Sequence, residues 1–278
     1  MNYRTLVIEQ QDSIARVILN RPDVRNAFDE TVIAELTQAF HALGADKSTR
    51  VIVLAARGPV FCAGADLQWM KKMAAYTHDE NRADAAKLAH MLRTIYECPK
   101  PVIAQVQGDC YAGGMGLVAA CDIAVAAEQA NFCLSEVRIG LIPATISPYV
   151  VKAMGHNAAR RYFLTAEKFS AHEALSMGFV HQVVSTNVLE TMEGIATAIA
   201  TSDPLGAAVD AIASALLAAS PNALKEAKRL VRDVGGVPIT DALIADTVER
   251  IADIRVSDEG REGVQSFLEK RKPSWVNR

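Results

Sequence analysis

The stretch "KPVIAQVQGDCYAGGMGLVAACDIAVAA", Lys100 to Ala127, places a glycine-rich turn between two apolar runs. The runs "PVIAQV" and "IAVAA" are apolar and partly β-branched, which is typical of strands buried in a parallel sheet. Between them, "GGMGLVAA" reads as a short apolar helix that begins in the turn. The order of strand, turn, helix and strand predicts an α/β fold.

The rest of the chain extends this pattern in both directions. Two short apolar runs separated by "QDS" predict a hairpin near the N-terminus, followed by a helix, a buried strand and a long helical region from about 67 to 96. The polar middle of that region, "AAYTHDENRADA", predicts a break or a mobile segment. From about Asn187 onward the pattern is almost wholly helical. We therefore expect an α/β core over residues 1–203 and a C-terminal helical region over 204–278.

Composition limits the classes of function. The 278 residues are 50% hydrophobic and carry a net charge of −3, so a nucleic-acid partner is not expected. No apolar run approaches the ~20 residues of a membrane span, and the polar N-terminus does not resemble a signal peptide. A cytoplasmic protein without a membrane partner is therefore expected. The five cysteines form no CxxC pair, so no metal site is predicted and they are interpreted as small buried residues.

Two glycine turns follow predicted buried strands, "FCAGADL" (Phe61–Leu67) and "YAGGMGL" (Tyr111–Leu117). Turns at the ends of strands gather on one rim of an α/β fold, where ligands bind. Two bare turns facing each other could direct two backbone N–H groups at one oxygen that becomes negative during a reaction. The alternative is that the glycines only permit turns and close packing. Neither segment matches a P-loop or the GxGxxG pattern.

With its flanking segments, the chain resembles the crotonase superfamily, the enoyl-CoA hydratase and isomerase family. This resemblance implies a core of repeated ββα units wound as a spiral, with a C-terminal helical region that forms homo-trimers or hexamers. It implies an acyl-CoA thioester substrate and no cofactor, since coenzyme A is part of the substrate. The matching segments are "NRPDVRNAF" (Asn20–Phe28), "FCAGADL", "KPVIAQVQGDCYAGGMGL", "CDIAVAAEQANFCLSEVRIGLIP" (Cys121–Pro143) and "EGVQSFLEKRKPSW" (Glu262–Trp275).

The same resemblance assigns roles to individual residues. The backbone N–H groups of Ala63 and Gly113 would form the oxyanion hole, and Glu136 in "LSEVRIGLIP" would transfer protons. A glutamate inside an apolar run also points to function, because burying it without a partner is costly. A salt bridge between Glu136 and Arg138 is the structural alternative. The expected contacts to substrate and CoA come from Val24, Arg25, Ala27, Ala63, Gly64, Ala65, Asp66, Leu67, Gly113, Gly114, Arg138, Phe267 and Lys270.

One position departs from the family pattern. Hydratases of the family commonly carry a first glutamate where this chain has Gly116, so Glu136 must act alone or with a helper such as Asp109, Tyr111 or an acid of "HDENRAD". Within the superfamily the chain most resembles methylglutaconyl-CoA and related branched glutaconyl-CoA hydratases of leucine and acyclic terpene breakdown. Their substrates end in a second carboxylate, for which Arg138, or the more distant Arg160 and Arg161, supplies a candidate cation. Arg138 is alternatively a solvated surface residue.

The sequence prediction is thus a hydratase that adds water to an α,β-unsaturated acyl-CoA. An enoyl-CoA isomerase needs only one glutamate and stays open because of Gly116. A thioester hydrolase or decarboxylase would use the same oxyanion hole, since fold does not fix the reaction. A non-catalytic protein that binds CoA or RNA is the rival from a different class, and the retained Glu136 and the acidic net charge speak against it.

Overall fold

Two sheets organise the molecule, whose computed structural model describes residues 3–185 and 203–277. The larger sheet has the order β1-β2-β3-β5-β7-β10, and only its β1–β2 pair is antiparallel. Its strands are β1 (Leu6–Gln11), β2 (Ile14–Leu19), β3 (Val51–Ala56), β5 (Val102–Val106), β7 (Ile123–Ala127) and β10 (Gln182–Val184). The predicted hairpin is therefore confirmed as β1 and β2.

The smaller sheet has the order β4-β6-β8-β9. Its strands are β4 (Val60–Cys62), β6 (Asp109–Tyr111), β8 (Asn131–Cys133) and β9 (Phe169–Ser170). In three successive units the chain passes from the larger sheet to the smaller one and then into a helix: β3 to β4, β5 to β6, and β7 to β8. The predicted α/β fold with repeated ββα units is confirmed.

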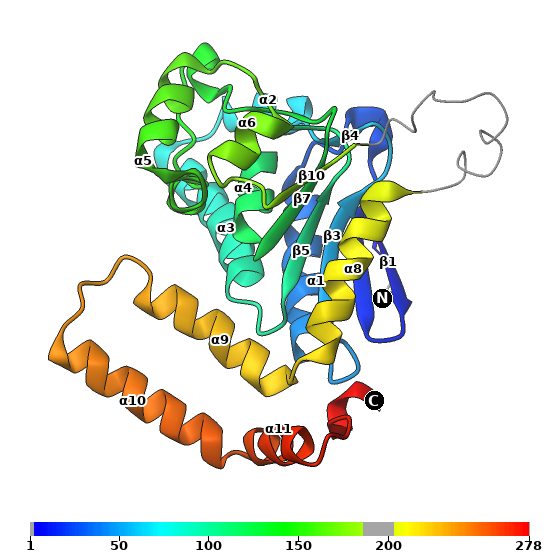
Figure 1. The fold of residues 1–278 in the computed structure, drawn as a ribbon. Coiled ribbons are helices and arrows are strands. Elements are labelled where there is room, and N and C mark those ends of the chain that lie inside the picture. The colour runs from blue at the N-terminus through cyan, green and yellow to red at the C-terminus, as the bar shows by residue number, and fades with distance from the viewer. Residues whose placement is uncertain (1–2, 186–202, 278) are drawn as a thin grey trace, which may run out of the picture.

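Helices follow each of these units (Figure 1). Helix α1 precedes the first unit, α2 and α3 follow β4, α4 follows β6, and α5 and α6 follow β8. Their bounds are α1 (Glu30–Ala45), α2 (Leu67–Met73), α3 (His78–Tyr96), α4 (Gly113–Ala120), α5 (Ser147–Thr165) and α6 (Ala171–Ser176), with 3-10 turns η1 (Pro22–Val24) and η2 (Glu136–Ile139).

A break does occur within the polar segment 74–85, as the sequence predicts, but it is short. The interruption between α2 and α3 covers only residues 74–77, and the text from His78 onward is helical. Thr77 and Glu80 form a capping box in which each side chain binds the other residue's backbone N–H, so α3 begins sharply at His78. The capping box therefore fixes the start of α3, although the first turns of this helix contain few apolar residues.

Alternation along the buried strands sends side chains to two cores. Ile52 and Leu54 of β3 face the main core with α1 and α3, whereas Val51 and Val53 face helix α8 (Pro204–Ala218) on the other side of the sheet. Leu205, Val209 and Ala213 of α8 complete this second core. The sheet is thus covered on both faces, as its near-continuous apolar strands predict.

The last helices extend away from the sheets at the bottom of Figure 1. They are α9 (Pro221–Val234), α10 (Asp241–Val256) and α11 (Asp258–Leu268), followed by η3 (Ser274–Asn277). Many of their apolar side chains are exposed, including Val248, Ile251 and Phe267. An exposed apolar face of this kind is typical of an interaction surface. The helical text predicted between 187 and 202 lies outside the described residues.

In the part of the chain that the structure describes, no single helix has the length and apolar character needed to cross a membrane. Helices α8 and α9 pass such a test only as a pair, and they are bent by 108° at the break between them.

Candidate active site

The two glycine turns lie against each other because β4 and β6 are neighbouring parallel strands. After β4 the chain turns at Gly64, whose φ of +92° is a conformation that favours glycine. After β6 it enters α4 at Gly113. A Cβ atom built on Gly64 would lie 3.0 Å from Cβ of Ala112 and 3.8 Å from the nitrogen of Gly113. The expected convergence of the two turns is therefore present, through two short strands of the smaller sheet.

Backbone hydrogen bonds decide which N–H groups are free in this pair of turns. The N–H of Ala63 donates to the carbonyl of Arg25 at 3.0 Å, so it is not available to a substrate. Phe28 and Ala65 form a parallel bridge in which the Phe28 N–H donates to Gly64 and the Asp66 N–H donates to Phe28. This pairing leaves the N–H of Ala65 without an acceptor among the described residues. The geometry does not fit the predicted role of Ala63, and Ala65 offers the free donor.

Gly113 supplies the second free N–H. It is the first residue of α4, so its N–H has no acceptor within the helix, and none is found elsewhere in the described chain. The aromatic ring of Phe28 packs directly against its Cα, because a Cβ built on Gly113 would overlap Cζ and lie 2.8 Å from Cε1. Any larger residue at position 113 would push the ring or the turn out of place.

Glu136 opens the turn η2, close in the fold to the start of α4. The N–H of Ala112 donates to the carbonyl of Cys133 at 2.8 Å, which ties the residue before Gly113 to the segment that leads into Glu136. Burial raises the pKa of Glu136 above its ordinary value, and a hydrogen bond from its own backbone opposes this only in part. Its Oε2 is buried and has no hydrogen-bond partner among the described residues. A raised pKa makes this half-buried carboxyl better suited to accept a proton and to donate it again.

The predicted alternative of a salt bridge from Glu136 to Arg138 is not found in the described chain. Nη2 of Arg138 instead donates to the carbonyl of Ala166 at 2.5 Å. This bond uses one nitrogen of an otherwise exposed guanidinium. Arg160 is exposed, and Arg161 pairs with Glu167 at 2.5 Å.

No carboxylate stands at position 116, and another side chain occupies the space. A Cβ built on Gly116 would overlap Cγ2 of Ile146, lie 2.8 Å from its Cβ and 3.6 Å from Cδ2 of Leu92. The structure thus fills with apolar carbon the space that a side chain at position 116 would need. Ile146 has no sequence signal of its own, since it is an ordinary apolar residue thirty positions away.

Other acids named as helpers fall into three situations. Asp109 accepts hydrogen bonds from Tyr111 Oη at 2.5 Å and from Asn131 at 3.1 Å. Within "HDENRAD", Asp79 and Glu80 are exposed, whereas Asp84 is buried and accepts a 3.4 Å bond from Nε1 of Trp69. Burial raises the pKa of Asp84. Trp69 in turn packs on Phe28, with ring centroids 5.9 Å apart, so Asp84 lies behind the aromatic pair that supports Gly113.

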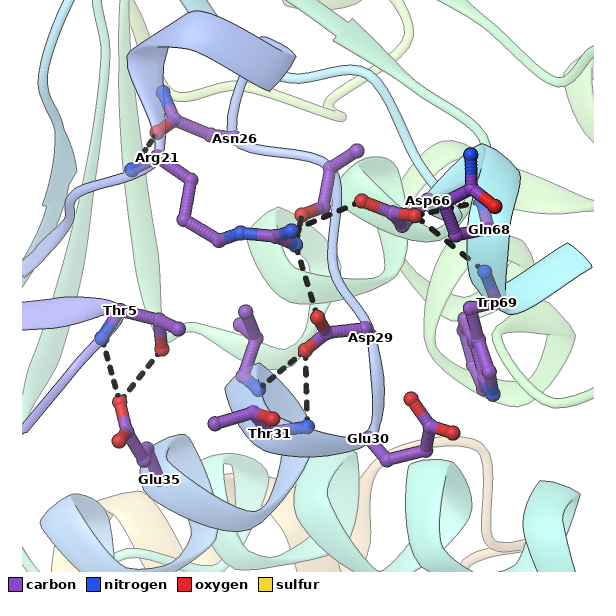
Figure 2. A network of polar contacts seen from close by, with 12 residues as sticks. Thr5, Arg21, Asn26, Asp29, Glu30, Thr31, Glu35, Asp66, Gln68 and Trp69 are labelled. Carbon is purple, nitrogen blue, oxygen red and sulfur yellow. Dashed lines mark hydrogen bonds and ion pairs between the residues drawn. The ribbon is translucent and has the colours of Figure 1, made fainter.

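The loop expected to hold CoA is fixed by Arg21, a residue that the sequence prediction missed (Figure 2). Its guanidinium donates to the carbonyl of Ala27 at 2.6 Å and to Asp66 at 2.9 Å, and lies 3.4 Å from Asp29. Both carboxylates also cap helices: Asp29 accepts from the first turn of α1 and Asp66 from the first turn of α2. Arg21 therefore holds the loop and two helix starts in one arrangement.

The predicted CoA contacts differ in exposure. Val24 is 43% and Leu67 73% exposed beside this loop, and Arg25 adopts a left-handed conformation with a φ of +55°. Ala27 and Gly114 are buried. Phe267 and Lys270 lie at the end of α11, on the opposite side of the chain from α2 and β4 (Figure 1). One chain alone does not bring them to the two turns.

Chemistry based on cysteine or metal finds no support among the described side chains. Burial raises the pKa of Cys62 to about 12 and that of Cys110 well above its ordinary value, which disfavours the thiolate. No group of three or more His, Cys, Asp or Glu suited to a metal ion occurs in residues 3–185 and 203–277.

Comparison with known proteins identifies the family of this chain. The sequence profile of the enoyl-CoA hydratase/isomerase family matches residues 9–278. The chain belongs to this family. A solved enoyl-CoA hydratase structure from Shewanella pealeana is 41% identical to it, with a TM-score of 0.89 over 98% of this chain and 96% of that one. The structure of Pseudomonas aeruginosa AtuE is 32% identical, with a TM-score of 0.87 over 98% of this chain and all of that one.

A curated relative gives the same family. Enoyl-CoA hydratase domain-containing protein 3 of Xenopus laevis, a mitochondrial protein, is 31% identical over 271 residues, which are 98% of this chain and 86% of the relative. The family and the fold together support an enoyl-CoA hydratase/isomerase enzyme with an enoyl-CoA hydratase-like function.

Proposed function

We propose that this family member adds water across the double bond of a branched α,β-unsaturated acyl-CoA whose acyl chain ends in a second carboxylate, such as 3-methylglutaconyl-CoA. The observation that carries the reaction is the state of Glu136: half-buried, with a raised pKa and a buried Oε2 that no described residue hydrogen-bonds. A carboxyl kept in this state is suited to take a proton from water and return it to carbon.

The substrate thioester would be held by the two free backbone donors. Its carbonyl oxygen would accept from the N–H groups of Ala65 and Gly113, which come from facing turns. As water attacks the β-carbon, negative charge moves onto this oxygen and the thioester becomes an enolate. Loss of one such donor typically costs about 3–4 kcal/mol of transition-state stabilisation.

Glu136 would complete the reaction as base and then acid. Its carboxylate takes a proton from the attacking water while the new C–O bond forms at the β-carbon. The enolate then collapses, and the protonated Glu136 delivers its proton to the α-carbon. Since Ile146 closes the space at Gly116, one carboxyl performs both transfers.

Arg138 would bind the distal carboxylate. One nitrogen of its guanidinium is held by Ala166, which fixes the side chain, and its remaining N–H groups can bind an anion. Arg138→Gln should lower kcat/KM for 3-methylglutaconyl-CoA about 10- to 100-fold, the loss typical of a charge-assisted hydrogen bond. It should leave kcat/KM for 3-methylcrotonyl-CoA unchanged, because that substrate lacks the second carboxylate. Arg161→Gln is the matched control, and equal losses on both substrates would contradict the assignment.

A second candidate is an enoyl-CoA isomerase, favoured by the apolar filling at Gly116. Moving a proton between two carbons needs one carboxyl and no activated water. The donors at Ala65 and Gly113 would serve the same enolate. Product analysis distinguishes the two reactions, because only hydration adds the mass of water.

The exposed apolar faces of α10 and α11 support a proposal on assembly. We propose that they pack against other copies of the chain in a trimer or hexamer, which would also carry Phe267 and Lys270 toward a neighbouring subunit's CoA. Their exposure in the single chain, 81% for Phe267, supports this proposal. Light scattering of the purified protein tests it, and a monomer at micromolar concentration would contradict it.

A further inference from the structure

A cleft of about 300 Å³ lies at the opposite end of α4 from Gly113. Its walls come from the C-terminal ends of α3 and α4, from α5 and from α9, which passes below α3 in the view of Figure 1. The residues that matter for its chemistry are Tyr96, Asp122, Tyr149, Lys152, Lys228 and Arg232. Its volume is at the lower end of the range for sites that bind small molecules.

The cleft is separate from the candidate active site. Leu92, Gly116 and Ile146 meet where α3, α4 and the start of α5 converge. Tyr96 follows Leu92 by one helical turn, and Tyr149 follows Ile146 by almost one turn, so the cleft begins beyond this apolar layer. Side chains of the layer divide the two spaces.

The charges around the cleft do not cancel. Lys228 is neutralised by Asp122 at 2.7 Å and also donates to the carbonyl of Lys100 at 3.1 Å. Lys152 donates to the hydroxyl of Tyr96 at 2.7 Å, and in the described chain it has no carboxylate partner. His181 also lines the cleft, and its Nδ1 accepts the backbone N–H of Ala124 at 3.1 Å.

Arg232 adds a second weakly neutralised cation. Its only ion pair in the described residues is a 3.4 Å contact from Nε to Asp233, and the other oxygen of Asp233 pairs with Arg250 at 2.8 Å. The two terminal nitrogens of Arg232 have no partner in the described structure. Lys152 comes from α5 of the core and Arg232 from α9, so two different elements contribute cations to the lining of the cleft.

A neutral donor accompanies these cations. The hydroxyl of Tyr149 has no hydrogen-bond partner in the described chain, although the residue is half-buried. Its ring packs edge-on against Tyr96, with centroids 5.3 Å apart. An anion bound here would receive hydrogen bonds from charged and neutral donors and would contact aromatic carbon.

We propose that this cleft is a second, non-catalytic binding site for a small anion that carries a carboxylate or phosphate group. The ammonium of Lys152 and the guanidinium of Arg232 bind the anionic group, and the Tyr149 hydroxyl donates to it. Because Lys152 belongs to α5 and Arg232 to α9, the bound anion links the C-terminal helices to the core. Ligand binding there stabilises the docking of α9.

Calorimetric titration of the full chain at constant ionic strength tests the proposal, with inorganic phosphate and glutarate as separate probes. Saturable binding of phosphate, glutarate or both is expected, and the two titrations show which anionic group the cleft prefers. Lys152→Met and Arg232→Gln should each lower the affinity for the anion about tenfold or more, which is the scale of a lost charge-assisted hydrogen bond. Tyr149→Phe should weaken it less.

Two controls keep the test specific. Lys225→Met removes a cation from α9 that pairs with Glu226 outside the cleft, and should leave the affinity unchanged. Saturating coenzyme A should not compete, because its phosphates are expected at the distant loop near Arg25. No saturable binding of either anion, equal losses in the Lys225 variant, or full competition by coenzyme A would each overturn the proposal.

Discussion

Ile146 packs against the backbone of Gly116 so closely that no side chain fits at position 116. A Cβ there would lie 2.8 Å from Cβ of Ile146, an atom that cannot move without the start of α5. The position where a hydratase of this family commonly carries its first glutamate is therefore closed by packing as well as by the missing side chain. In the reaction that we propose, proton transfer therefore falls to Glu136.

Gly116→Glu should destabilise the protein and should not raise hydration. Forcing side-chain atoms into a filled core typically costs about 1–3 kcal/mol, and burying a carboxylate among Leu92 and Ile146 adds to this. Urea denaturation measures the loss in free energy of unfolding. In the double variant with Ile146→Ala, part of the lost stability should return. A single Gly116→Glu variant as stable as the parent and faster in hydration would contradict this packing.

Gly113→Ala should lower kcat strongly and the free energy of unfolding only modestly. The added methyl group overlaps the ring of Phe28 and shifts the N–H that we assign to the thioester oxygen. A misplaced oxyanion donor should lower kcat by about 10²- to 10³-fold. Steady-state kinetics with the preferred enoyl-CoA measures this. Gly44→Ala in α1 is the control for an added methyl group, since the atom nearest to a Cβ built there is Cδ of Pro99 at 3.2 Å. Retention of near-parental kcat in Gly113→Ala would remove Gly113 from the donor pair.

Arg21→Met should weaken both folding and CoA binding. The guanidinium of Arg21 bonds the carbonyl of Ala27 and links the capping residues Asp29 and Asp66 (Figure 2). Its loss should cost about 1–3 kcal/mol of unfolding free energy, because the capping carboxylates lose a half-buried partner. Arg57→Met is the control, since among the described residues the side chain of Arg57 makes only an exposed 3.6 Å pair with Glu9. Equal stability of the two variants would contradict a structural role for Arg21.

The Arg21 effect should also depend on pH. Burial tends to raise the pKa of Asp66, but hydrogen bonds from the N–H groups of Gln68 and Trp69 and from Arg21 hold it below its ordinary value of 3.8. A carboxyl with a lowered native pKa contributes stability above its unfolded pKa, and this contribution is lost as pH falls through the native pKa. The stability difference between parent and Arg21→Met should therefore be smaller at pH 3 than at pH 7. A stability difference that is the same at pH 3 and pH 7 would show that the ionisation of Asp66 is not its source.

The contribution of Glu136 to stability should change with pH in the direction opposite to that of Asp66. Its native pKa is raised by burial above the ordinary 4.5, so its contribution is complete below that value and is lost as pH rises through the native pKa. Glu136→Gln should consequently be at least as stable as the parent at pH 7, although we expect it to be inactive. The pH profile of kcat/KM should show an acid limb with a midpoint above 4.5, because the free enzyme needs the carboxylate. A midpoint at or below 4.5 would contradict the raised pKa.

Much of the fold could be predicted from the sequence, because its buried strands coincide with apolar runs that end at turn residues. The hairpin of β1 and β2, the apolar strands β3 and β5 and the two glycine turns follow from apolar runs with clear punctuation. The helix start at His78 was missed because polar residues hid its capping box. The pairing of short strands into a second sheet was not predicted from the residue pattern, because three-residue strands such as β4 and β6 are too short to show a period.

The sequence could suggest which residues form the candidate site, but it could not predict the hydrogen bonds among them. The roles of Glu136 and Gly113 stay predictions of the resemblance, while the choice between the N–H groups of Ala63 and Ala65 depends on a bridge to Phe28 more than thirty residues earlier. Ile146 and Arg21 act through contacts between segments far apart in the chain, and neither has a local pattern that predicts this.

The most direct test of single-carboxyl hydration is turnover of 3-methylglutaconyl-CoA in deuterated water, followed by mass spectrometry, for the parent and Glu136→Gln. Hydration by Glu136 predicts a product heavier by one molecule of D2O, with deuterium on the α-carbon, and loss of this product in the variant. Deuterium uptake with a shifted double bond and no added water would contradict hydration and place the isomerase first. Hydration that persists in Glu136→Gln would contradict the role of Glu136 itself.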